Sequence, residues 1–243
     1  MGLSHSPKIV TDNTLIFCLD AGNTKSYSGS GTDWKDLLGN SDTFDGSTYT
    51  YPSFGTTGNT KYFTFVNNGT TINNIKNGGT VSVNTQTVYS RLAWFYQTSQ
   101  SSAWAPIIQN SIGNNSDMGL TTSGNKLHFR QYKNSNNGVD GDSGYTSTGS
   151  FSNNVWVFGA ITVNLTSRVC KFYINGEYDS QASLNIIGNS NSNVILIGGA
   201  DTDSYSGDRM FKGRIATAMH YNRVLTDAEV LQNFNALRGR FGV

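Results

Sequence analysis

Charge is scarce in this sequence. Only 14% of the 243 residues are charged, against about a quarter in an average soluble protein. The formal net charge is +1, and the lysines and arginines are spread evenly along the chain. Binding to DNA or RNA needs a concentrated basic surface. The sequence therefore predicts a protein with no nucleic-acid partner.

Glutamate is almost absent, because Glu177 and Glu229 are the only two in the chain. Glycan hydrolases built on two stacked sheets usually carry a Glu-x-Asp-x-x-Glu strand, which this chain does not contain. The HExxH motif, the Gly-x-Ser-x-Gly elbow and the P-loop are missing too. His128 and His220 alternate with apolar neighbours, and we expect them to be structural. We therefore predict a protein that is not an enzyme. A hydrolase that uses two aspartates as acid and base is the less favoured alternative.

Cysteine and long apolar runs are also rare. Cys18 and Cys170 are too few for a disulfide scaffold or a cysteine-only zinc site, and each lies in an apolar run that predicts a buried free thiol. No run approaches the roughly 18 apolar residues of a membrane span, so no membrane insertion is expected. Residues 1–8 lack the apolar stretch of a signal peptide, which predicts no Sec-dependent export.

Uncharged polar residues replace charge, with 28 Asn, 28 Ser, 26 Thr and 27 Gly. They disfavour helix interiors and favour turns and strand faces, which excludes helical bundles. Short segments rich in β-branched and aromatic residues predict strands, and strands with one buried face predict an all-β sandwich of two antiparallel sheets. The predicted strands are residues 14–19, 61–66, 87–97, 105–111, 126–133, 155–163, 168–175, 177–183, 194–197 and 214–221.

Two local signals are sharper than the rest. The Asn175-Gly176 pair predicts a two-residue type I′ hairpin turn, because both residue types tolerate positive φ. Thr226 and Glu229 form a capping-box pattern and predict one helix over residues 226–238, with Gly239 just beyond its end. Apolar residues recur at helical spacing in this segment, so we expect the helix to pack on an edge of the sandwich.

One loop has the composition of a calcium site. Asp201, Asp203 and Asp208 bring three carboxylates together, and Ca²⁺ prefers oxygen ligands. The loop is not an EF-hand, because its twelfth position is a lysine. Calcium is thus the one candidate cofactor, with these three aspartates as its ligands. The alternative is a polar loop whose carboxylates are solvated.

Aromatic residues offer a second kind of site. Trp94 and Trp156 lie in dense strand segments, and we expect them in the core. Trp104, Tyr145 and Tyr205 lie next to Ser- and Gly-rich stretches, and we predict that they are exposed and bind a glycan. The alternative is that these loop aromatics close the end of the core.

Four segments of the second half follow a characteristic order. They are a Trp-containing strand at 154–163, an Asn-Gly-Glu hairpin at 171–177, a strand ending in Gly-Gly at 194–199, and a closing strand and helix at 211–230. In this order they resemble the laminin G-like, concanavalin A-like jelly-roll family. The resemblance implies a two-sheet jelly-roll sandwich with one short C-terminal helix.

Residues 4–10, 18–27, 29–37 and 233–242 resemble the ends of virion structural proteins of tailed phages, especially marine and cyanobacterial ones. This resemblance implies a non-catalytic structural or adhesive role on the virion, as a capsid decoration, a head or tail fibre, or an accessory protein. A protein made in the host cytoplasm without a signal peptide would reach the virion by assembly. The alternative function is a lectin module that attaches to host glycans.

The sequence predicts two parts, an N-terminal arm over residues 1–13 and a jelly-roll domain over residues 14–243. Pro7 favours an extended arm, which we expect to bind other virion proteins. Symmetric virions present repeated sites, so we expect a homo-oligomer or another multicopy arrangement.

Overall fold

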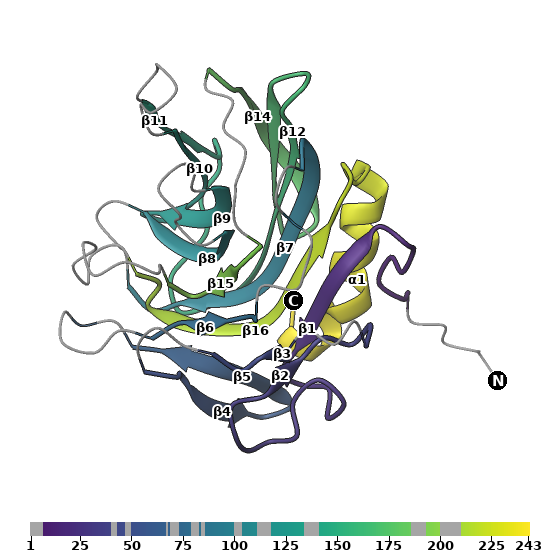
Figure 1. Cartoon of the computed structure of the whole chain (residues 1–243), viewed down its shortest axis with the longest axis vertical. Helices are drawn as coiled ribbons and strands as arrows, with labels where there is room; N and C mark the ends of the chain where they lie inside the picture. Colours follow the sequence, from purple (N-terminus) through teal and green to yellow (C-terminus); the bar gives the residue numbers. More distant parts are fainter. Residues whose placement is uncertain are drawn as a thin grey trace.

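Two antiparallel β-sheets lie face to face in the computed structural model, and helix α1 covers part of the outer face of the larger sheet (Figure 1). This arrangement confirms the predicted sandwich with a C-terminal helix. Within the described residues, no helix is long and apolar enough to cross a membrane. The structure describes residues 7–39, 43–46, 50–66, 68, 73–78, 83, 86–99, 104–110, 118–133, 141–185, 193–199 and 210–243.

The larger sheet has eight strands among the described residues, in the order β14-β13-β12-β7-β16-β5-β4, with β1 also pairing with β16. Strand β5 pairs with the first residues of β16 and β1 pairs with the last, so β5 and β1 share one edge of β16. The strands are β1 (Leu15–Asp20), β4 (Ser53–Thr57), β5 (Thr60–Phe65), β7 (Val88–Gln97), β12 (Trp156–Asn164), β13 (Val169–Ile174), β14 (Glu177–Ser183) and β16 (Gly213–Tyr221).

The smaller sheet has six strands in the described part of the chain, in the order β11-β10-β9-β8-β15-β6. A separate pair of two-residue strands, β2 (Trp34–Lys35) and β3 (Thr43–Phe44), lies beside the sandwich. The six strands are β6 (Ile75–Lys76), β8 (Ala105–Asn110), β9 (Met118–Ser123), β10 (Lys126–Lys133), β11 (Gly141–Thr146) and β15 (Ile195–Ile197).

The main core lies between the sheets and is rich in phenylalanine. Phe95 and Phe172 of the larger sheet belong to the same buried cluster as Phe129 of the smaller sheet. Strands β7 and β12 are buried on both faces along most of their length, because the smaller sheet covers one face and α1 covers the other. Cys18 and Cys170 are buried free thiols, as predicted.

The hairpin between β13 and β14 turns at the predicted pair. Asn175 has φ 52° and Gly176 has φ 84°, as a type I′ turn requires. The turn also packs on the helix, because a Cβ at Gly176 would lie 2.8 Å from the Cβ of Phe234. The Asn-Gly pair therefore forms the turn, and the absence of a side chain at Gly176 leaves room for Phe234 of α1.

Helix α1 (Asp227–Phe241) begins at the predicted N-cap. The hydroxyl of Thr226 accepts a hydrogen bond from the backbone N–H of Glu229, whose carboxylate accepts one from the backbone N–H of Thr226. The predicted end at Gly239 is wrong: the helix continues to Phe241, and Gly242 is the C-cap with φ 74°. The extra turn places the ring of Phe241 on that of Trp94, with centroids 4.0 Å apart.

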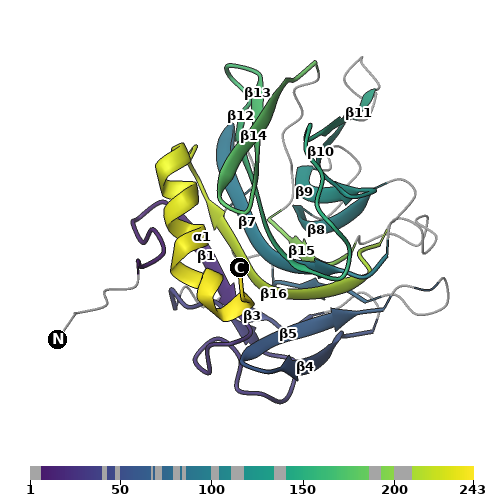
Figure 2. The same ribbon diagram turned by 180° about the vertical axis from the view of Figure 1, so that it is seen from behind.

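The described part of the N-terminal arm packs on its own chain. The carbonyl of Val10 accepts a hydrogen bond from the Tyr221 hydroxyl at 2.8 Å, and the N–H of Val10 donates to Oδ1 of Asn233 at 2.9 Å. Asp12 pairs with Arg223 at 2.8 Å. Figure 2 shows α1 in front of β1 and β16, on the side of the larger sheet that faces away from the smaller sheet.

Candidate functional site

The outer face of the larger sheet is divided into two parts. Helix α1 and the arm cover one part, which we call the covered half; it contains the buried side chains of Trp94, Phe158, Tyr173 and Met219. Beyond the C-terminal end of α1 lies a second part that we call the open strip. The open strip consists of the partly exposed side chains of Tyr96, Trp156 and Arg214, together with Tyr62, which is only 5% exposed.

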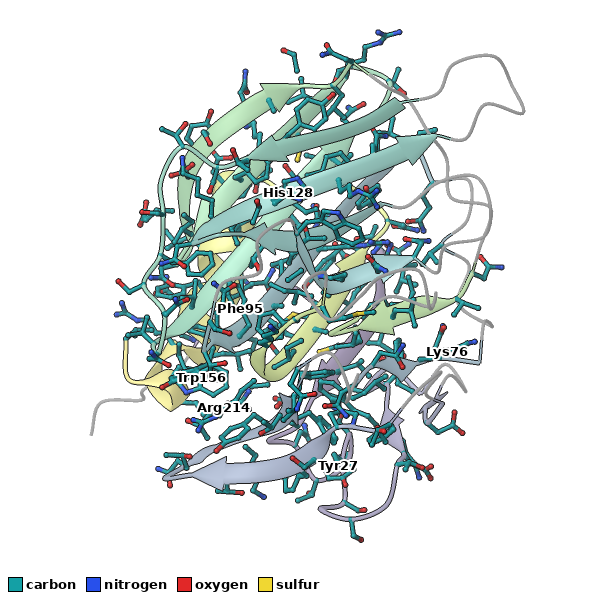
Figure 3. All side chains as sticks on the ribbon, turned by 90° about the vertical axis from the view of Figure 1, so that its left-hand side faces the viewer. Tyr27, Lys76, Phe95, His128, Trp156 and Arg214 are labelled. Atoms are coloured by element: carbon teal, nitrogen blue, oxygen red, sulfur yellow. The ribbon has the colours of Figure 1, made fainter. Side chains whose placement is uncertain are left out.

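Strand pairing brings the open strip together from four strands. Arg214 of β16 and Trp156 of β12 lie directly opposite Tyr96 of β7, one on each side. Paired residues in antiparallel strands point to the same face of a sheet. Figure 3 shows Trp156 and Arg214 close together on one side of the molecule. Tyr62 of β5 completes the strip, and it lies over Gly55, where a Cβ would come within 2.8 Å of its ring.

Arg214 is sandwiched between two aromatic rings. Its Cζ atom lies 4.6 Å from the ring centroid of Tyr62 and 4.7 Å from that of Tyr96. The rings attract the cation through their π systems and do not use up its N–H donors. Among the described residues, Arg214 makes no ion pair and donates no side-chain hydrogen bond. The hydroxyl of Tyr62 lies 2.7 Å from Oγ1 of Thr57, which fixes that ring.

Trp156 is anchored on one side and partly exposed on the other. Its ring centroid lies 5.0 Å from that of Phe241, 5.7 Å from that of Tyr96 and 5.8 Å from that of Tyr62. The expectation that Trp156 is a core residue is therefore only half right. The ring sits where α1 ends, so the helix covers part of it and leaves the rest in contact with water.

A pocket of about 430 Å³ lies at the Arg214 end of the open strip, where β5, β7 and β16 meet the rim of the sheet. We call it the rim pocket. Gly213 allows β16 to start there, because a Cβ at this position would lie 2.0 Å from the carbonyl oxygen of Tyr96. None of the described residues that line it is acidic. The described lining residues are Thr64, Phe65, Val66, Asn68, Thr98, Ser99, Lys212, Gly213 and Arg214.

The open strip and the rim pocket present aromatic rings, neutral polar groups and two cationic side chains. Glycoside hydrolysis needs two carboxyl groups that flank the scissile bond, one of them as acid or base. Neither the strip nor the pocket contains an aspartate or a glutamate among its described residues. Glu229 instead pairs with Arg223 at 2.7 Å, and this hydrogen bond lowers the pKa of Glu229 to about 2. Glu229 is therefore ionised at neutral pH, and its carboxylate takes part in the capping box of α1.

The structure places Trp104 elsewhere than the sequence suggests. Its ring is 6% exposed and lies under the guanidinium of Arg130, with the Cζ atom 4.0 Å from the ring centroid. The expectation that this ring is exposed is wrong, because β10 brings Arg130 over it. Its assignment to glycan binding stays a prediction.

Tyr145 is half-buried and has partners of its own. Its ring stacks on Phe129 at 6.3 Å, and its hydroxyl accepts a hydrogen bond from the N–H of Asn185 at 2.6 Å. Tyr205 and the predicted calcium ligands Asp201, Asp203 and Asp208 lie outside the described residues. Within the residues that the structure describes, no group of three His, Cys, Asp or Glu side chains could hold a metal ion.

Both strand histidines are buried and make polar contacts. Nδ1 of His220 accepts a hydrogen bond from Arg91 at 3.2 Å, and its Nε2 lies 2.7 Å from Gln86. Burial and the nearby charge of Arg91 hold the pKa of His220 well below its usual value. Nδ1 of His128 lies 2.6 Å from Oγ1 of Thr121. These contacts fit the structural role expected for both histidines.

Sequence reasoning missed the open strip. Trp94 and Tyr96 lie two residues apart on one face of β7, and Trp156 and Phe158 lie two residues apart on the same face of β12. That repeat of aromatic residues on one face was the available signal, but nothing in it says where the covering helix ends. Arg214 carried no local signal, because both of its aromatic partners come from other strands.

Comparison with known proteins supports the fold. A family model of the concanavalin A-like lectin/glucanases superfamily matches residues 68–231. Domain 4 of AbnA, an extracellular arabinanase from Geobacillus stearothermophilus solved with arabinotriose, has a TM-score of 0.63 and 19% identity, over 90% of this chain and 98% of that one. No curated protein sequence matches the chain.

Binding domains of toxins are similar as well. The receptor binding domain of botulinum neurotoxin type G has a TM-score of 0.59 and 20% identity, over 91% of this chain and 51% of that one. The binding domain of Paraclostridial mosquitocidal protein 1 has a TM-score of 0.62 and 19% identity, over 92% and 52%. The chain thus spans about half the length of these toxin domains. Because the family model covers more than half of the chain, the protein belongs to the concanavalin A-like lectin/glucanases superfamily.

Proposed function

We propose that this chain is a non-catalytic glycan-binding domain and that the open strip is its binding surface. One observation carries the proposal: two partly exposed rings, Tyr96 and Trp156, lie side by side next to a pocket of about 430 Å³. Ligand sites combine aromatic walls with a few placed polar groups. The rim pocket supplies such groups through Thr64, Thr98 and other polar side chains.

The chemistry of a sugar matches this surface. A pyranose or furanose ring has an apolar C–H side and an edge of hydroxyl groups. The rings of Tyr96 and Trp156 can cover the apolar side, while hydroxyl and amide groups of the rim pocket hydrogen-bond the edge. All four residues of the strip lie on paired strands, so little ordering is needed when a ligand binds.

Two further observations support a binding role. Domain 4 of AbnA, which shares the fold, was solved in complex with arabinotriose, and the similar toxin domains are named as binding domains. Their identities are too low to carry a ligand over to this chain. The described residues of the strip and the rim pocket include no carboxylate, which favours binding without hydrolysis.

The proposal can be tested by glycan-array screening followed by calorimetry on the best ligand. Trp156→Ala and Tyr96→Ala should each weaken binding tenfold or more, because each removes a stacking surface. Tyr178→Ala is the matched control, since Tyr178 is 46% exposed but lies on β14, away from the strip. Unchanged affinity in both strip variants would refute the assignment.

The place where this domain acts is a separate proposal. The resemblance of the segments at both ends to tailed-phage structural proteins supports a virion location, as a capsid decoration, fibre or accessory protein that attaches to host glycans. The contacts of Val10 and Asp12 with the rest of the chain suggest that residues 10–12 stabilise the domain rather than tether it. A cryo-EM map of the parent particle tests this location. If the protein is absent from purified particles, the virion location is overturned.

A further inference from the structure

Resting on the proposed glycan-binding surface, we propose that its ligand is an acidic oligosaccharide whose carboxylate or sulfate group is bound by Arg214 and Lys212. Both residues line the rim pocket, on either side of Gly213. The pocket therefore presents two positive charges and no negative charge among its described residues.

The first step concerns Arg214. Arg214 has only the rings of Tyr62 and Tyr96 as side-chain partners among the described residues. The contacts with the two rings restrict the movement of the side chain. The N–H groups of a guanidinium form a fork, which is the geometry that binds a carboxylate or sulfate through two parallel hydrogen bonds.

The second step concerns Lys212. Its backbone carbonyl accepts hydrogen bonds from the N–H of Thr98 at 3.0 Å and from Oγ1 of Thr98 at 3.2 Å. The backbone is therefore fixed at the rim, while the ammonium group makes no ion pair within the described part of the chain. A second positive charge beside the fork of Arg214 raises the attraction for an anion and offers donors to its remaining oxygens.

The spacing of the strip residues sets a minimum size for the ligand. From Arg214 to Trp156 the strip crosses three neighbouring strands, with Arg214 on β16, Tyr96 on β7 and Trp156 on β12. At a strand spacing of about 4.8 Å, Arg214 and Trp156 are separated by roughly 10 Å along the sheet. A ligand that stacks on Trp156 must extend across β7 before an acidic group reaches Arg214. This span requires an oligosaccharide with its acidic residue toward the rim pocket.

The experiment compares three ligands with one backbone: a neutral oligosaccharide, its uronate form and its sulfate ester. Calorimetry with the full chain should show at least tenfold tighter binding of one acidic form than of the neutral form. Added salt should weaken the binding of the acidic form and leave that of the neutral form unchanged. The uronate and sulfate arms decide which acidic group the pocket selects.

Variants complete the test. Arg214→Gln and Lys212→Gln should each reduce the affinity for the acidic ligand toward that for the neutral one. Lys126→Gln, on the smaller sheet, is the matched control and should change neither the affinity for the acidic ligand nor that for the neutral ligand. Lys212 stacks on no ring among the described residues, so the Lys212→Gln variant still tests the proposal if Arg214→Gln fails to fold.

The outcomes separate the two proposals. If the neutral and acidic forms bind equally and neither glutamine variant changes their affinity, the proposal of an acidic ligand is overturned. The proposal of a glycan-binding surface then still stands. A chain that binds none of the three ligands, nor any glycan on an array, overturns both.

Discussion

Trp94 and Tyr96 lie two residues apart on the same face of β7, yet they belong to different environments. Trp94 is fully buried in the covered half, where its ring stacks on Phe241 at 4.0 Å and on Phe234 at 5.5 Å. Tyr96 lies in the open strip, where it contacts Arg214 and Trp156 and stays partly exposed.

The boundary between the two environments is the end of α1. Gly242 stops the helix one residue after Phe241, so the last ring of the helix reaches Trp94 and the edge of Trp156 but not Tyr96. Aromatic residues of one strand face therefore stabilise the fold on one side of this boundary and can bind a ligand on the other. The position of a helix C-cap decides which of them is available.

The largest expected effect separates the two tryptophans. Trp94→Ala should lower the free energy of unfolding by about 3–5 kcal/mol, because it leaves a cavity between two rings of α1 and the sheet. Trp156→Ala should cost at most about 2 kcal/mol, because part of its ring is already in water. Urea denaturation of both variants measures this difference. Equal losses would mean that the strip is an ordinary part of the core.

A second prediction concerns the arm, which helps to cover the sheet. Deleting residues 1–12 should lower the free energy of unfolding by roughly 2 kcal/mol, because it removes the two hydrogen bonds of Val10 and the pair of Asp12 with Arg223. Deleting residues 1–6 is the matched control, since it removes none of these contacts. Glycan affinity should be the same in both truncated chains. If the longer deletion leaves stability unchanged, the arm is not part of the cover.

The smallest effect should come from the other end of the covering helix. Arg223 holds the pKa of Glu229 at about 2, below its ordinary value of 4.5. This pair therefore stabilises the folded state above about pH 4.5, and the stabilisation is lost as the pH falls toward 2. Glu229→Gln should cost about 1 kcal/mol at pH 7 and nothing near pH 2.

Thermal denaturation from pH 2 to 7 measures this change, with Glu177→Gln as the control. If Glu229→Gln lowers stability by the same amount at every pH from 2 to 7, the ion pair of Glu229 with Arg223 does not stabilise the fold.

The sequence predicted the elements whose signals are local. The Asn175-Gly176 turn needs only two residues with positive φ, and the start of α1 needs only the capping box of Thr226 and Glu229. Strands β10 and β14 have the predicted bounds, because Gly124 and Gly176, both with positive φ, form turns just before them. The end of α1 was misplaced, because Phe241 is held by a distant ring rather than by its neighbours.

The candidate site could not be predicted in the same way. Trp104 lies near Ser-rich sequence but is buried under Arg130, while Trp156 lies in a strand but is partly exposed. Both results depend on side chains brought in by other strands or by the helix. The fork of Arg214 likewise exists only once β16 has paired between β5 and β7.

The most direct measurement follows the indole N–H signals of the four tryptophans by NMR while a glycan ligand is added. The signal of Trp156 should shift, because its ring is on the binding surface, whereas the signals of Trp34 and Trp94 should stay in place, because both rings are fully buried. A shift of the Trp104 signal alone would move the site to the smaller sheet. That result, with Trp156 unchanged, would contradict the open strip as the glycan-binding surface.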